Sequence, residues 1–188
     1  MQKKGSPMPT FVSHAAVPLA LGAGLGEEAI PRRLLAAGAV ASLLPDLDVV
    51  GLRLGVPYAS ALGHRGASHS LAFALAVAAL GAALHGPLRC RARTAFLFLL
   101  AAAASHGLLD AFTNGGLGVA ILWPLSDARW FAPVRPIHVA PLGLHGLRVR
   151  GVALLVSEAI WVWAPCAALA LVLAWRRRSA RREGGDAV

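Results

Sequence analysis

Four short clusters of polar and ionisable side chains interrupt an otherwise apolar sequence. They are Ser13–His14, Pro45–Asp48, His64–Ser70 and Ser105–Asp110. Burying histidine and aspartate among apolar helices costs free energy unless the side chains pair with each other or bind an ion. The clusters therefore predict a hydrophilic, metal-binding site inside a membrane protein.

His106 and Asp110 are four positions apart, so on a helix they share one face with Cβ atoms about 6 Å apart. An imidazole and a carboxylate on one face can bind one metal ion, or the carboxylate can bridge two. In a soluble protein the same spacing would more often be a surface pair. Here an alanine run precedes His106 and two leucines precede Asp110, which favours metal ligands over a solvated surface.

Asp46 and Asp48 follow Pro45, which disfavours helix at the preceding residue and predicts a break. In an extended segment residues i and i+2 project to the same side, so the two carboxylates would repel each other unless a divalent cation lay between them. The alternative is a solvated turn that caps the preceding helix. The sequence does not separate the roles of Asp46 and Asp48.

His64 and His69 are five residues apart around Gly66, so they cannot share a face of a regular helix. A loop that folds back would bring both into one site. Arg65 has the planar guanidinium that suits a phosphate or a carboxylate. The alternative is one metal-binding histidine and one structural histidine.

Other ionisable residues are weaker candidates. A lone histidine on an apolar face, such as His14, is more often a core residue. Glu158 is the sole acid of the last apolar stretch, where an ionised carboxylate costs about 3 kcal/mol, and it could be a ligand, a general base or a neutral acid. His138 and His145 are spare candidates, and His85 is expected to be structural.

Composition predicts a one-domain integral membrane protein. Only 14% of the 188 residues are charged and 57% are hydrophobic, whereas soluble proteins average about 25% charged residues. The net charge of +9 comes mainly from arginines at the edges of apolar stretches. That placement favours a membrane lipid partner and disfavours nucleic-acid binding.

Five apolar stretches are expected to form membrane-embedded helices, since only helices satisfy their own backbone in a bilayer and barrel patterning is absent. They are roughly Phe11–Gly26, Leu34–Val50, Ser70–His85, Thr94–Phe112 and Val152–Trp175. The first three are short for a hydrocarbon core of about 30 Å. Between the fourth and fifth helices, Thr113–Gly151 is expected to be a long ordered loop that has room for a short interfacial helix but not for a membrane span. Residues 1–175 would form one all-α domain, and residues 176–188 a disordered, polybasic cytoplasmic tail.

Threading these helices through a membrane places every polar cluster on one side. The other side holds ten of the eighteen basic residues, namely Arg32, Arg33, Arg89, Arg91, Arg93 and the five arginines of the tail. The positive-inside rule makes that side cytoplasmic, so the site would lie near the outer face of a bacterial inner membrane. An alternative interpretation makes residues 1–26 a cleavable signal peptide.

Histidine and carboxylate ligands without thiolates fit zinc, or another borderline divalent ion such as Mn²⁺, and the set offers ligands for one to three ions. Two ions can clamp the attacking and departing oxygens of a phosphoester.

The ordered set of motifs resembles the YdjM-like family of membrane-bound metal-dependent hydrolases over roughly residues 10–175. The motifs are Leu43–Asp48, His64–Ser70, Ser105–Asp110 and Trp123–Pro124. That family is similar in turn to the helical zinc-dependent phospholipase C and single-strand nuclease superfamily. The ligand order of the superfamily is matched by His14, Asp46 or Asp48, His64 or His69, and His106 with Asp110. Its later H-x-x-x-E pair is missing, because Leu154 stands four residues before Glu158.

We therefore expect a membrane-bound hydrolase that uses metal-activated water to cleave a phosphoester of a lipid or small molecule. Arg65 would hold the phosphate and Glu158 would act in catalysis. The metal ligands would come from His14, Asp46, Asp48, His64, His69, His106 and Asp110. The alternatives are a non-enzymatic metal-binding protein or ion transporter, and a scaffold whose polar clusters only pair helices. The sequence does not predict the oligomeric state.

Overall fold

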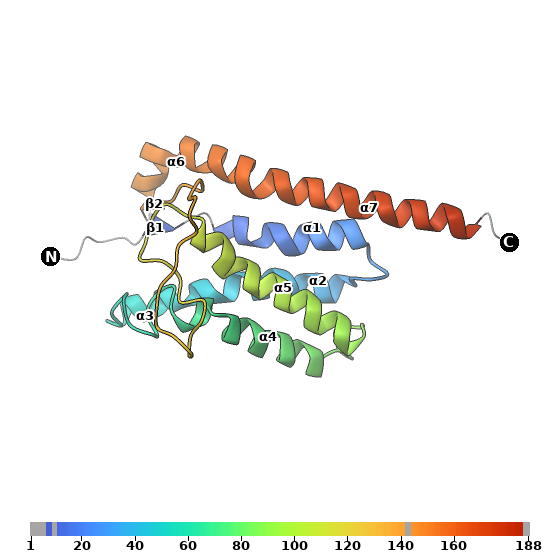
Figure 1. The fold of residues 1–188 in the computed structure, drawn as a ribbon, viewed down its shortest axis with the longest axis horizontal. Coiled ribbons are helices and arrows are strands. Elements are labelled where there is room, and N and C mark those ends of the chain that lie inside the picture. The colour runs from blue at the N-terminus through green and yellow to red at the C-terminus, as the bar shows by residue number, and fades with distance from the viewer. Residues whose placement is uncertain (1–6, 9–10, 142–143, 186–188) are drawn as a thin grey trace.

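The computed structural model describes residues 7–8, 11–141 and 144–185, and most of these residues are helical (Figure 1). Two short antiparallel strands, β1 (Pro7–Met8) and β2 (Ala140–Pro141), pair with each other. The helices follow in chain order: η1 (Phe11–Ala15), α1 (Ala16–Leu25), α2 (Arg32–Leu43), η2 (Leu44–Asp48), α3 (Val49–Arg53), η3 (Ala67–His69), α4 (Leu71–Ala83), α5 (Ala92–Ala111), α6 (Leu144–Glu158), η4 (Ala159–Trp163) and α7 (Ala164–Gly185). The elements η1, η2 and η3 are 3₁₀ helices, and η4 is a π-helix within the last helical segment.

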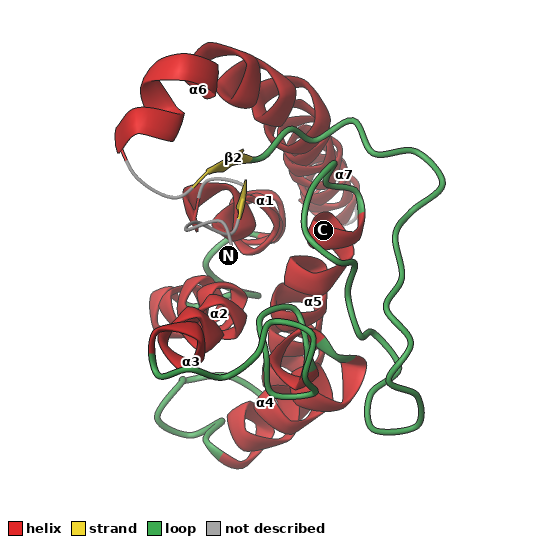
Figure 2. Cartoon of the chain, turned by 90° about the vertical axis from the view of Figure 1, so that its left-hand side faces the viewer, coloured by secondary structure: helices red, strands yellow, loops and turns green. Residues whose placement is uncertain are grey.

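These elements join into five apolar helical segments, which confirms the predicted all-α membrane fold. Three segments are long and apolar enough to cross a membrane: Arg32–Arg53, Ala92–Ala111 and Gly151–Glu183. Two are shorter, Val12–Leu25 and Leu71–Ala83. The predicted long connector between the fourth and fifth segments is also present, and it runs along the outside of one end of the bundle (Figure 2).

The second segment is longer than the sequence indicated. Pro45 lies in the first turn of η2, where a missing backbone N–H removes no helical hydrogen bond. The chain therefore tightens into a 3₁₀ turn and continues as helix to Arg53. The last helical segment also begins early, at Leu144, inside the stretch that was expected to be loop.

The arginine-rich tail is a helix through Gly185, whereas the sequence led us to expect disorder from residue 176. Arginine has a high helix propensity, so the apolar helix can continue into this segment. The tail is also held from outside, because Arg181 forms an ion pair with Glu28 in the α1–α2 connector. The guanidinium of Arg177 lies close against Gly26.

The helix α5 lies in the middle of the bundle and packs against α4, α2 and α1, while α7 covers α1 (Figure 1). Its buried side chains Phe98 and Leu99 form a core with Ile30 and Leu34. Glycine permits two of these close approaches. A Cβ at Gly38 would lie 2.3 Å from Phe98 Cε1, and one at Gly81 would lie 2.0 Å from Leu99 Cδ1.

Replacing Gly38 with valine should destabilise the bundle, because the new side chain would overlap the buried ring of Phe98. We expect a loss of about 1–3 kcal/mol in the free energy of unfolding, measured by denaturation in detergent micelles. The control is Gly86→Val in the α4–α5 connector, where an added Cβ meets nothing within 4 Å. Equal losses in the two variants would contradict this packing.

Candidate metal centre

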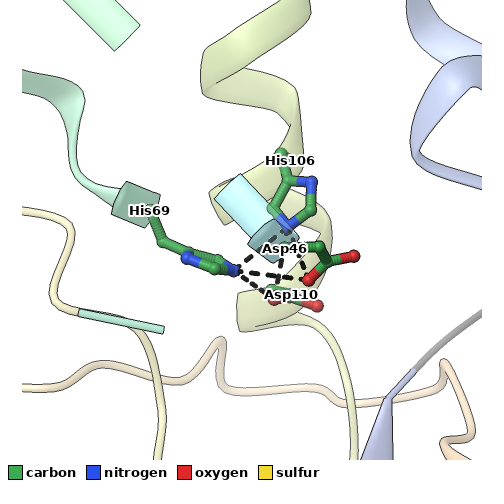
Figure 3. A group of neighbouring side chains, drawn as sticks. All are labelled: Asp46, His69, His106 and Asp110. Atoms are coloured by element: carbon green, nitrogen blue, oxygen red, sulfur yellow. Dashed lines mark hydrogen bonds and ion pairs between the residues drawn. The ribbon is translucent and has the colours of Figure 1, made fainter. Parts of the chain in front are cut away.

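Four buried side chains from three elements meet where α5 ends and α2 passes into η2 (Figure 3). Asp46 comes from η2, His69 from η3, and His106 and Asp110 from the last turns of α5. Each brings one nitrogen or oxygen atom within 4.8 Å of the others, and none of the four is more than 6% exposed. The four residues, called the cluster below, were all predicted as metal ligands.

The spacing of the cluster atoms suits one small divalent cation. His69 Nε2 lies 3.1 Å from His106 Nε2 and 3.2 Å from Asp110 Oδ2. His106 Nε2 lies 3.4 Å from Asp46 Oδ1. Ligand atoms at about 2.0–2.1 Å from a tetrahedral ion are themselves about 3.3–3.4 Å apart. The side chains therefore stand close to the separations that shared coordination requires.

In His69 and His106 the Nδ1 atom makes a hydrogen bond outside the cluster, which leaves Nε2 facing the cluster. His106 Nδ1 is 2.7 Å from the carbonyl oxygen of Ser42, so Nδ1 carries the proton and Nε2 keeps its lone pair. Ser68 donates its hydroxyl hydrogen to Asp48 and accepts from His69 Nδ1 at 3.0 Å. In the neutral rings, two nitrogen lone pairs then face each other at 3.1 Å. A cation between the rings, or a shared proton, removes this repulsion.

Asp46 and Asp48 have different surroundings, which corrects the expectation that they project to one side. A 3₁₀ helix turns about 120° per residue, so positions i and i+2 face different directions. Asp46 points into the cluster. Asp48 instead accepts from His64 Nδ1 at 2.6 Å, from the Ser68 hydroxyl at 2.6 Å and from the Arg65 backbone N–H at 3.2 Å.

Asp48, His64 and His69 form a second group whose atoms lie within 4.8 Å of one another. His64 Nε2 is buried and has no hydrogen-bond partner among the described residues. The loop that carries His64 folds back toward η3, as the spacing around Gly66 predicted. This second group could orient His69 or hold a further cation.

His14 lies against the cluster on its other side. Its ring stacks on the ring of His106, with centroids 3.7 Å apart and planes 18° from parallel. His14 Nε2 is 3.9 Å from Asp110 Oδ1, and both of its ring nitrogens are buried without a hydrogen-bond partner in the described part of the chain. Asp110 thus presents Oδ2 to His69 and Oδ1 toward His14.

Arg65 is completely buried beside the cluster, where the sequence led us to expect a phosphate contact. Its guanidinium donates to Asp110 Oδ1 at 3.1 Å, to Thr113 Oγ1 at 2.8 Å and to the Gly115 carbonyl at 2.8 Å. These contacts tie the end of α5 to the following loop. They give Arg65 the geometry of a residue that positions Asp110.

Glu158 belongs to neither group of neighbouring histidines and carboxylates. It is 2% exposed and accepts a hydrogen bond of 2.9 Å from Ser13, the residue before His14. His138 is exposed, and His85 Nδ1 lies 3.2 Å from the Cys90 carbonyl at the other end of the bundle. The side chain of His145 lies outside the described residues.

The electrostatic environment of His69 favours positive charge. Burial lowers the pKa of His69, but hydrogen bonds and charge from Asp110 and Asp48 outweigh burial and raise the pKa to about 9. The same two carboxylates would favour a bound cation in place of the proton.

Two groups that position the site by hydrogen bonds were not predicted from the sequence. The Ser42 carbonyl that orients His106 is a backbone group, so no residue type signals it. Arg129 donates to the carbonyl oxygens of Tyr58, Ser60 and His64, each at 3.0 Å, and thereby holds the loop that carries His64. An arginine in a long loop gives no sign of this role in the sequence.

Comparisons with known proteins agree with the resemblance drawn from the motifs. A family model described as "YdjM inner membrane protein" matches residues 8–182. "Inner membrane protein YbcI" of Escherichia coli (strain K12) is 46% identical over 178 residues, which cover 91% of this chain and 100% of that relative. No solved structure matches the chain. Similarity to the phospholipase C and nuclease superfamily stays a prediction.

Replacing Arg65 with glutamine should destabilise the metal-free protein, because the buried carboxylate of Asp110 would lose its charged partner. Removing one member of a buried ion pair costs about 3–5 kcal/mol, which chemical denaturation in detergent would measure. Arg53→Gln removes the same charge from an exposed position and should change the free energy of unfolding by less than about 0.5 kcal/mol. Similar effects in both variants would exclude the positioning role of Arg65.

Proposed function

This chain belongs to the YdjM inner membrane protein family, and from that premise we propose that it is a metal-dependent hydrolase that cleaves a phosphoester. One observation carries the proposal. His69 and His106 direct their Nε2 atoms at each other 3.1 Å apart, beside carboxylate oxygens of Asp46 and Asp110. This is an arrangement that a divalent cation would complete.

The ligand types favour catalysis over a purely structural ion. Structural zinc sites use mainly thiolates, whereas many catalytic sites combine histidine with a carboxylate. Neither Cys90 nor Cys166 belongs to the cluster. Zinc or Mn²⁺ fits the ligand set. When bound, such an ion supplies a Lewis acid for a phosphoryl oxygen and lowers the pKa of water to about 7.

The residues of the chain would divide this work. Asp46, His69, His106 and Asp110 would hold the first ion. Asp110 also presents an oxygen toward His14, so its carboxylate could bridge to a second ion. A third ion would draw on Asp48 and His64. We propose that Arg65 positions Asp110. Glu158 would fix the segment that carries His14, because it accepts the hydrogen bond of the neighbouring Ser13.

A second candidate is a non-enzymatic metal-binding membrane protein. The burial of the cluster favours it, since none of its four residues is more than 6% exposed. Four protein ligands also complete a tetrahedral ion and leave no position for water, as in structural sites. An ion transporter fits less well, because the half of the bundle beyond the cluster is formed by apolar stretches such as Leu71–Ala83.

Metal analysis and hydrolysis measured on one preparation would separate these candidates. We expect detergent-purified protein to bind zinc or Mn²⁺ stoichiometrically after chelator treatment and reloading. His106→Ala and Asp110→Ala should lose the ion, whereas the exposed His138→Ala should retain it. Asp48→Asn should weaken metal affinity about 10- to 100-fold, because Asp48 orients His69.

The metal-loaded protein should hydrolyse a phosphodiester or phospholipid, and activity should disappear with the metal in His106→Ala. Stoichiometric metal without turnover on any ester would favour the second candidate. Metal content unchanged in both His106→Ala and Asp110→Ala would exclude the cluster as a metal site.

We also propose that the cluster lies near the outer face of the membrane and that the arginine-rich end and the C-terminus are cytoplasmic. Cys90 lies in the α4–α5 connector at the arginine-rich end and is partly accessible. A membrane-impermeant maleimide should therefore label Cys90 only after cells are lysed. The Cys90→Ser variant identifies the labelled residue, and labelling of Cys90 in intact cells would reverse the orientation.

A further inference from the structure

The α1–α2 and α4–α5 connectors lie at the end of the bundle opposite the cluster (Figure 1). Residues of both connectors line an open hollow of about 640 Å³. Its lining is mixed, and its polar members are Glu28, His85, Arg89, Arg91 and Thr94. A second hollow of about 440 Å³ adjoins it, and Arg91 and Thr94 line both. The two hollows therefore lie side by side at the first turn of α5.

The second hollow is mostly apolar. Its lining includes Leu21 and Leu25 of α1 and Leu97 and Phe98 of α5. Arg91, Arg93 and Thr94, at the start of α5, complete the lining. A mostly apolar groove between two helices, next to a hollow lined by arginines, has the polarity of a site for an amphiphile.

This end of the bundle is positive because its arginines outnumber its acids, and both acids of the α1–α2 connector are paired. Glu28 is engaged by Arg181, and Glu27 is 3.0 Å from Arg32. By contrast, Arg89, Arg91 and Arg93 are exposed and form no ion pair within the described ranges. Their guanidinium groups are thus available to a phosphate, which accepts paired hydrogen bonds from arginine.

We propose that the two hollows together bind one anionic phospholipid. Its phosphate would lie among Arg89, Arg91 and Arg93, and one acyl chain would follow the groove along Leu21, Leu25 and Leu97. At 20 residues, or about 30 Å, α5 is long enough to span the hydrocarbon core. Arg91 and Arg93 therefore stand at headgroup level, where basic pockets between membrane helices recognise anionic lipids.

This site is separate from the cluster and does not depend on the proposed hydrolase activity. Fifteen residues separate Arg91 from His106 along α5, a distance of about 22 Å at 1.5 Å per residue. A headgroup held by the arginines cannot reach the histidines. The bound lipid is therefore a ligand of the fold and not the substrate.

The test uses the full chain, delipidated in detergent and titrated with dioleoyl phosphatidylglycerol or dioleoyl phosphatidylcholine, with native mass spectrometry as readout. One phosphatidylglycerol per chain should be retained in preference to phosphatidylcholine, which has the same acyl chains. Replacing Arg89, Arg91 and Arg93 together with glutamine should weaken retention about 10- to 100-fold. The charge-matched control replaces Arg176, Arg178 and Arg182, which lie outside both hollows, and should change retention less than about twofold.

A second variant, Leu25→Trp, fills the apolar groove without altering charge and should also weaken retention. It keeps the test decisive if the triple arginine variant does not fold. Equal retention of the two lipids, equal loss in the two triple variants, or unchanged retention in Leu25→Trp would overturn the proposal. Displacement of the phosphatidylglycerol by millimolar inorganic phosphate would also overturn it, because the groove would then contribute nothing.

Discussion

The facing nitrogen atoms of His69 and His106 impose the constraint around which the polar end of this bundle is built. Each ring is turned inward by a hydrogen bond at its other nitrogen, to Asp48 with Ser68 for His69 and to the Ser42 carbonyl for His106. If both nitrogens were unprotonated, their lone pairs would face each other at 3.1 Å beside buried carboxylates, which is unfavourable in apolar surroundings. The arrangement therefore favours a cation or a proton at this position.

The elements around the cluster hold its side chains in place, first by direct contact and then through the neighbouring loops. The regular spacing of α5 supplies His106 and Asp110 from one helix face. Arg65 compensates the charge of Asp110 and ties it to the loop that follows α5, while Arg129 holds the loop of His64 through backbone carbonyls. Loops are ordinarily mobile. Here the hydrogen bonds of the buried Arg65 and the half-buried Arg129 fix the loops that metal ligands would need.

The sequence predicted the parts of this site that depend on local spacing and hydrophobicity. Five apolar stretches gave five helical segments, and the spacing of His106 and Asp110 gave a shared helix face. The different roles of Asp46 and Asp48 could not be predicted, because they depend on whether the chain after Pro45 is extended or a 3₁₀ turn. The burial of Arg65 depends on tertiary contacts with Thr113 and Gly115. No local pattern contains that information.

The two ends of the bundle differ in their charged groups. Carboxylates paired with Arg65 and histidines lie at the cluster, and about 22 Å away along α5 lie arginines that form no ion pair within the described residues. X-ray absorption spectroscopy of the zinc-loaded protein tests the proposed metal site most directly. We predict two imidazole nitrogens and carboxylate oxygens at about 2.0–2.2 Å, without sulfur. A sulfur ligand, or a spectrum without imidazole scattering, would contradict the account.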